Sequence, residues 1–149
     1  MQTPSFIVNE DQIRRNLDVL ASVKARTGCK VLLALKGFAM WRLFPLIREV
    51  LDGVCASSPW EARLGREEFA KEVHAYAAAY SDQDVDELMT LCDEIDFNSF
   101  SQLNHFRDRG VLNHKTMTFG LRINPECSTQ SHAIYDPCAP KSRLGILRA

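Results

Sequence analysis

The sequence of 149 residues lacks the features that mark several large classes of protein. Its 18 Lys and Arg residues nearly balance its 19 Asp and Glu residues, so a net charge of -1 gives no general attraction to nucleic acid or to an anionic membrane. No apolar run is long enough to span a bilayer, and residues 1–5 lack the basic segment and apolar core of a signal peptide. We therefore expect a cytoplasmic protein without nucleic-acid or membrane partners.

Motifs for metals, disulfides and nucleotides are also missing. The five cysteines are odd in number and widely spaced without a C-x-x-C pair, so we expect reduced thiols. The four histidines follow neither metal-ligand spacing nor a triad pattern, and we predict no metal site. The absence of G-x-G-x-x-G and phosphate-loop signatures argues against a dinucleotide or a nucleoside triphosphate. A hydrophobic content of 46% is instead typical of a globular domain, or of part of a larger one.

Strand-like and helix-like segments alternate along the chain. Asn9 is suited to cap a helix that ends near Gly28, and the apolar run 30–35 that follows is typical of a buried strand. The alternation predicts an α/β fold with a parallel sheet, although periodicity alone leaves open a doubly wound sheet or the first half of a barrel. The predicted strands are 5–8, 30–35, 53–56, 73–77, 94–97 and 117–123, and the predicted helices are 10–27, 41–51, 60–70, 82–91 and 100–109; residues 143–149 resemble the approach to a further strand.

Ligands of such folds bind at the carboxyl ends of the strands, where three positions stand out. Lys36 follows the run 30–35, where desolvation favours a nucleophilic amine, although it could simply extend its ammonium into solvent. Ser57 and Ser58 could bind an anion or cap the next helix. Arg122 lies in an apolar strand, where a phosphate, a carboxylate ligand or a structural ion pair would satisfy it.

Several blocks resemble one enzyme family over essentially the whole chain. Residues 33–41 (LALKGFAMW) are similar to the cofactor-lysine region of carboxynorspermidine decarboxylases. The other similar blocks, in the same order, are 51–54 (LDGV), 56–58 (ASS), 61–68 (EARLGREE), 97–99 (FNS), 121–125 (LRINP), 135–140 (YDPCAP) and 142–145 (SRLG).

The resemblance implies a pyridoxal-phosphate decarboxylase of the alanine-racemase-like fold. The expected fold is part of a (βα)8 TIM-type barrel, which in the family is followed by a β domain, and the expected assembly is a homodimer. The expected activity is decarboxylation of carboxynorspermidine or carboxyspermidine to norspermidine or spermidine in polyamine biosynthesis. Lys36 matches the Schiff-base lysine of the family, and Ser58, Arg122 and Arg143 match positions near the cofactor or the substrate.

The chain also departs from the family pattern. Cys55 stands where ornithine and diaminopimelate decarboxylases carry an aspartate, which removes one acidic partner for Arg122 and for the imine. The ring-stacking histidine, the glycine-rich phosphate loop and the β domain of the family match no part of the sequence. We therefore expect residues 1–149 to be the N-terminal portion of the barrel domain, without a second domain, and not to complete an active site alone. The alternatives are a non-catalytic pyridoxal-phosphate carrier, a regulatory barrel fragment, or a related diaminopimelate- or ornithine-type decarboxylase.

Overall fold

A five-stranded parallel sheet organises the protein, for which a computed structural model describes residues 3–113 and 116–147. The strands follow one another across the sheet in chain order, and each pairs in parallel with the next. A doubly wound sheet reverses its strand order at a switch point, whereas a barrel does not. The predicted α/β class is therefore confirmed, and the order is that of a barrel. The strands are β1 (Leu32–Ala34), β2 (Gly53–Ala56), β3 (Glu72–Tyr76), β4 (Glu94–Phe97) and β5 (Thr118–Leu121).

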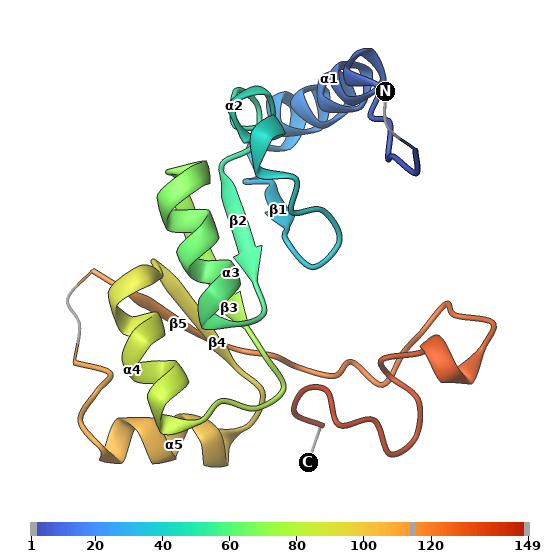
Figure 1. Ribbon diagram of the computed structural model, residues 1–149. Coiled ribbons are helices and arrows are strands. Elements are labelled where there is room, and N and C mark those ends of the chain that lie inside the picture. The colour runs from blue at the N-terminus through green and yellow to red at the C-terminus, as the bar shows by residue number, and fades with distance from the viewer. Residues whose placement is uncertain (1–2, 114–115, 148–149) are drawn as a thin grey trace.

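The helices that alternate with these strands cover one face of the sheet. Figure 1 shows α3, α4 and α5 along the same side, and every second residue of β2, β3 and β4 is buried beneath them. This face holds the hydrophobic core, in which Phe97 is fully buried between the rings of Phe106 and Phe119. The helices are α1 (Glu10–Thr27), α2 (Phe44–Ile47), α3 (Pro59–Leu64), α4 (Asp82–Leu91) and α5 (Phe100–Asp108), with short 3-10 helices at Trp41–Leu43 and Ala133–Tyr135 and a π-helix at Gly65–Phe69.

Local capping fixes the ends of the longer helices where the sequence predicts them. The Asn9 side chain accepts a hydrogen bond from the Gln12 amide at 3.1 Å and begins α1, and Gly28 ends it in the left-handed conformation. Ser81 and Asp84 form a reciprocal capping box at the start of α4. Both helices therefore have the predicted boundaries.

A single parallel bridge follows the five strands of the sheet. Ile123 and Ile146 form a parallel bridge, in which the Asn124 amide donates to the Ile146 carbonyl and the Ile146 amide donates to the Arg122 carbonyl, both at 2.9 Å. This bridge lies where the sequence predicts the approach to a further strand; residues 148–149 lie outside the described part.

Two predictions about the N-terminal third are wrong. Residues 5–8 form no strand; Phe6 and Ile7 are 100% and 78% exposed, and no strand of the described chain lies beside them to complete a ladder. The predicted helix 41–51 shortens to a 3-10 turn followed by α2, because Pro45 can only begin a helix and the Lys71 ammonium binds the carbonyls of Arg48 and Leu51.

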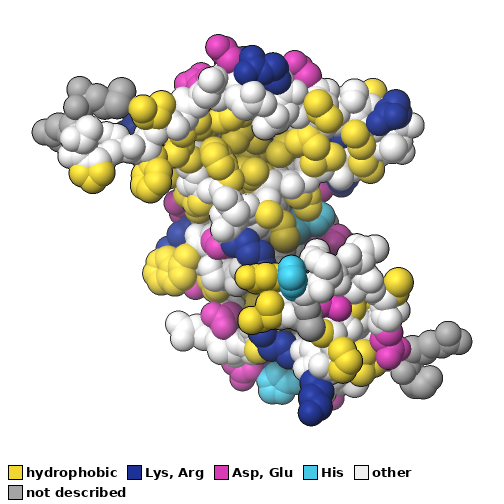
Figure 2. All heavy atoms as spheres, turned by 90° about the vertical axis from the view of Figure 1, so that its right-hand side faces the viewer, with side chains coloured by type: hydrophobic (Ala, Val, Ile, Leu, Met, Phe, Trp, Pro, Cys, Tyr) yellow, Lys and Arg dark blue, Asp and Glu magenta, His cyan; other side chains and the backbone are white. Residues whose placement is uncertain are grey.

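The face of the sheet opposite the helices is open. In Figure 2, which looks at the right-hand side of Figure 1, hydrophobic side chains gather in the upper part of this face, next to α1. Burial along β1 is accordingly incomplete: Leu33 is half-buried and Ala34 is exposed, although the sequence predicts a strand covered on both sides. Within the described residues, no helix combines the length and apolarity needed to cross a membrane.

Candidate active site

Lys36 extends from the carboxyl end of β1, at one end of the sheet. Its side chain is exposed, and the residues that the structure describes offer its Nζ neither a hydrogen bond nor an ion pair. The described residues therefore do not provide the desolvated setting that the sequence predicts, and β1 is an edge strand of the sheet. The amine is sterically free to react.

Alternate residues of neighbouring strands form layers on the open face. One layer runs from Ala34 through Cys55 and His74 to Glu94, as the strand register shows. In the next layer Tyr76 pairs with Asp96, and Asp96 pairs with Gly120. A Cβ atom at Gly120 would lie 1.9 Å from Asp96 Oδ1, so the absence of a side chain there makes room for the carboxyl group. Such layers are the way that barrel interiors are filled.

The pKa values of two groups on this face respond to burial and to nearby charges. Burial raises the pKa of the Cys55 thiol, the Asp96 carboxylate raises it further, and the nearby Lys36 ammonium lowers it. Burial also raises the pKa of Asp96, and Glu94 adds to this effect while His74 opposes it. Asp96 supplies a carboxyl group to the same face as Cys55. No ion pair joins Asp96 to Lys36 or Arg122 within the described residues.

Ser58 caps a helix. Its hydroxyl accepts a hydrogen bond from the Glu61 amide at 3.3 Å, and the Glu61 carboxylate accepts from the Ser57 amide at 2.6 Å. The corner after β4 repeats this arrangement, because Ser99 caps α5 and Gln102 accepts from the Asn98 amide at 2.9 Å. Of the two roles predicted for Ser58, the structure shows helix capping. At each corner the residue before the cap, Ser57 or Asn98, directly follows the strand.

Arg122 packs on an aromatic ring that belongs to a polar network. Its guanidinium lies 4.8 Å from the centre of the Tyr76 ring, in cation–π geometry. The Tyr76 hydroxyl donates to Asn98 Oδ1 at 2.8 Å, and Asn98 Nδ2 donates to the Arg143 carbonyl at 2.8 Å. Among the described residues Arg122 therefore forms no structural ion pair, and a phosphate or carboxylate ligand stays a prediction. Arg122 and Arg143 are joined through two intervening residues, Tyr76 and Asn98.

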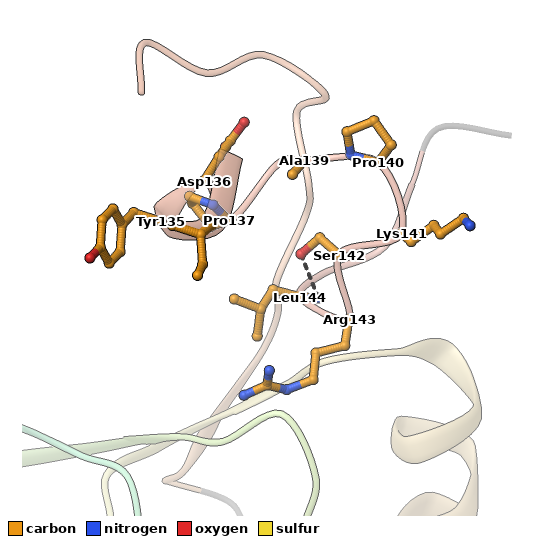
Figure 3. A pocket seen from close by; sticks show the side chains of 10 residues that line it. Tyr135, Asp136, Pro137, Ala139, Pro140, Lys141, Ser142, Arg143 and Leu144 are labelled. Atoms are coloured by element: carbon orange, nitrogen blue, oxygen red, sulfur yellow. Dashed lines mark hydrogen bonds between the residues drawn. The ribbon is translucent and has the colours of Figure 1, made fainter. Parts of the chain in front are cut away.

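The loop that precedes Arg143 encloses a cavity of about 450 Å³ between residues 134 and 144. Figure 3 shows this loop from close by: the Lys141 and Arg143 side chains extend in opposite directions, and the Ser142 hydroxyl accepts from the Leu144 amide at 3.2 Å. Gly145 follows with a positive φ of 82°. The loop thus turns sharply where Arg143 meets the sheet.

The structure does not bring all four predicted residues together. Arg122 and Arg143 share the network at the end of β4 and β5, whereas Lys36 stands at the end of β1, four interstrand spacings away, or roughly 19 Å along a flat sheet. Ser58 contacts none of them through a hydrogen bond among the described residues. Tyr76, Asp96 and Asn98 escaped prediction as site residues. The sequence contained a signal for them. Polar residues alternate with apolar ones along β3, where Tyr76 lies, and along β4, where Asp96 lies, and Asn98 continues this alternation just after β4.

Comparisons with known proteins agree with this architecture. No family model matches the chain. The crystal structure of carboxynorspermidine decarboxylase complexed with norspermidine from Campylobacter jejuni aligns with a TM-score of 0.82 and 37% identity, over 99% of this chain and 36% of that one. The chain therefore resembles the N-terminal part of a carboxynorspermidine decarboxylase. The resemblance inferred from the sequence blocks is confirmed.

Curated relatives extend the similarity. A carboxynorspermidine/carboxyspermidine decarboxylase of Herminiimonas arsenicoxydans is 42% identical over 145 residues, which cover 97% of this chain and 39% of the relative. The corresponding enzyme of Campylobacter jejuni is 40% identical, over 98% of this chain and 37% of its own length. A carboxyaminopropylagmatine decarboxylase of Synechocystis is 41% identical, over 100% and 38%. The chain spans less than two-fifths of the length of these decarboxylases.

Proposed function

We propose that this chain forms the N-terminal part of the barrel of a pyridoxal-phosphate-dependent decarboxylase that acts on carboxynorspermidine or carboxyspermidine. The single observation that carries the proposal is identity of 40–42% to two such decarboxylases across nearly all of the chain. The unreversed order of the parallel strands supports it, because that order suits a barrel. Reading the gene beyond the codon for Ala149 tests whether the chain continues.

Lys36 is the residue that we propose to hold pyridoxal phosphate covalently. The side chains at the carboxyl edge have the chemistry that the cofactor needs: Lys36 offers an exposed amine without a competing partner among the described residues, and Arg122 and Arg143, at the other side of the sheet, bring positive charge for anionic groups. When bound, the cofactor accepts the electrons left by the departing carboxylate. The role of Lys36 is to supply the nitrogen at the end of β1, and the role of Arg122, held on Tyr76, is to present a fixed cation.

A second substrate is supported by one specific observation. The carboxyaminopropylagmatine decarboxylase is as similar to this chain as the other two relatives are, at 41% identity. Its substrate carries a guanidinium group in place of a terminal amine. Carboxyaminopropylagmatine is therefore the alternative substrate to compare with carboxynorspermidine and carboxyspermidine.

Borohydride reduction of the protein, expressed at the full length of its gene, tests the lysine. We expect peptide mass spectrometry to find the reduced cofactor on Lys36, and Lys36→Ala to lose both this label and the release of carbon dioxide. Lys30→Ala is the matched control, because Lys30 lies just before the same strand but is bound to Glu72 at 2.5 Å. A label on another lysine would contradict the role of Lys36, and a label without carbon dioxide release from any of the three substrates would indicate a carrier.

A further inference from the structure

The side chain of Asn98 joins three segments of the chain that are far apart in sequence. Its Oδ1 accepts hydrogen bonds from the Tyr76 hydroxyl at the end of β3 and from the Gly145 amide, both at 2.8 Å. Its Nδ2 donates to the Arg143 carbonyl at 2.8 Å. A single amide group thus holds the end of β4, the end of β3 and the loop that leads to the bridge at Ile146.

This arrangement needs the chemistry of an amide. The oxygen must accept twice and the nitrogen must donate once, from one planar group. The equivalent corner after β2 carries Ser57, whose backbone amide binds Glu61 in the way that the Asn98 amide binds Gln102. The two corners therefore have the same backbone structure, and the long-range bonds of Asn98 are an addition that this corner structure does not require.

Asn98 also links the backbone of Arg143 to the ring on which Arg122 packs. The Tyr76 ring that it fixes carries the Arg122 guanidinium at 4.8 Å, and the carbonyl that it binds belongs to Arg143 itself. The Ile123–Ile146 bridge holds the chain after Gly145 independently, through two backbone hydrogen bonds. Removing the Asn98 amide therefore releases residues 143–145 and leaves the sheet intact.

We propose that Asn98 is a positioning residue that sets the separation of Arg122 and Arg143, so that both guanidinium groups meet an anionic group, such as the carboxylate of the substrate, at the carboxyl edge of the sheet. This proposal rests on the proposed function for its substrate. The hydrogen bonds of Asn98 to the loop can be tested whether or not the protein has the proposed decarboxylase activity.

The test compares Asn98→Asp, Tyr76→Phe and the control Asn16→Asp in the full-length protein. Asn98→Asp keeps both acceptor bonds of Oδ1 but loses the donor to Arg143, whereas Asn16→Asp adds the same charge on the exposed face of α1. Trypsin, which cleaves after Lys and Arg, reports release of the loop through the rate at the Arg143–Leu144 bond. We expect this rate to rise about tenfold in Asn98→Asp, by the loss of one hydrogen bond, less in Tyr76→Phe, and not in Asn16→Asp.

Steady-state kinetics test the consequence. We expect the KM for the carboxylated polyamine to rise about five- to tenfold in Asn98→Asp, with kcat changed less than twofold, because binding and not the chemical step depends on the arginine pair. Equal tryptic rates in Asn98→Asp and Asn16→Asp would overturn the proposal, and so would faster cleavage with an unchanged KM. If circular dichroism shows that Asn98→Asp does not fold, the tryptic rate and the KM of Tyr76→Phe test the proposal instead. A parent protein without decarboxylation would refute the proposed function alone, since the tryptic rates still test the bonds of Asn98.

Discussion

Replacing Gly145 by alanine is expected to disturb the junction between the loop and the Ile123–Ile146 bridge. Gly145 has φ of +82°, and a Cβ atom there would lie 2.7 Å from the Asn124 amide nitrogen and 2.9 Å from the Ile123 carbonyl carbon. Both contacts are with backbone that the bridge to Ile146 holds in place. The substitution must therefore either break the bridge or move Gly145 away from Asn98.

Gly110→Ala provides a matched control for the backbone strain. Gly110 has a similar φ of +73°, but a Cβ atom there meets nothing within 4 Å. Each alanine pays about 1–2 kcal/mol for the left-handed conformation. Gly145→Ala adds about 1–3 kcal/mol for the crowded contacts. The difference between the two variants isolates the close approach of the chain at Gly145.

Urea titration of the two purified variants measures these free energies of unfolding. We expect Gly145→Ala to lower the free energy by about 2–5 kcal/mol and Gly110→Ala by about 1–2 kcal/mol. We also expect decarboxylation by the full-length protein to fall only in Gly145→Ala, because Arg143 lies two residues before Gly145. Equal losses of stability in the two variants would refute the argument that the backbone of residues 123–124 excludes a side chain at position 145.

Two further predictions concern titratable groups away from the site. The hydrogen bond from Lys24 is the main reason that the pKa of Asp52 lies below its ordinary value of 3.8, and the Val31 amide adds to it. The Asp52 carboxylate therefore stabilises the fold at pH values above its unfolded-state pKa, and this contribution is lost as the pH falls through the folded-state pKa. In urea titrations, Asp52→Asn should lower the free energy of unfolding by about 1–3 kcal/mol at pH 7 and by much less at pH 3. Burial raises the pKa of the Cys92 thiol to about 12, so iodoacetamide at pH 8 should alkylate the exposed Cys29 and leave Cys92 unmodified until the protein unfolds, as peptide mass spectrometry can measure. An Asp52→Asn effect that does not depend on pH, or early alkylation of Cys92, would contradict these two predictions.

Elements with local signals were predictable to within a residue or two. The caps Asn9 and Ser81 fix the starts of α1 and α4, and the alternating pattern of residues 94–97 fixes β4. Elements that depend on partners were not predictable. Residues 5–8 have the composition of a strand but no neighbour among the described residues, and a strand requires one.

The candidate site divides in the same way. Lys36 and Arg122 were predictable, because each charged residue follows or ends an apolar strand. The partner of Arg122 was not, since the Tyr76 ring is 46 positions away in the sequence and reaches it only through the register of β3, β4 and β5. The desolvation of Lys36 could not be judged either, because it depends on what covers an edge strand.

The repeated corners of the fold separate structural polar groups from those available for a ligand. After β2 and after β4, a serine and the Glu or Gln three residues later satisfy the free amides at the start of a helix, so Ser58 and Ser99 have their hydroxyls occupied. Asp52 and Asp93, just before β2 and β4, are also occupied by structural hydrogen bonds. Each carboxylate accepts from a backbone amide of the neighbouring strand segment. Once these groups are set aside, the polar side chains at the carboxyl edge that reach beyond their own corner are those of Tyr76, Asn98 and Arg122, together with the unpaired amine of Lys36. These are the groups that this edge of the described chain leaves for a ligand: a fixed cation at Arg122 for an anionic group, and at Lys36, on the opposite side of the sheet, an amine that can react.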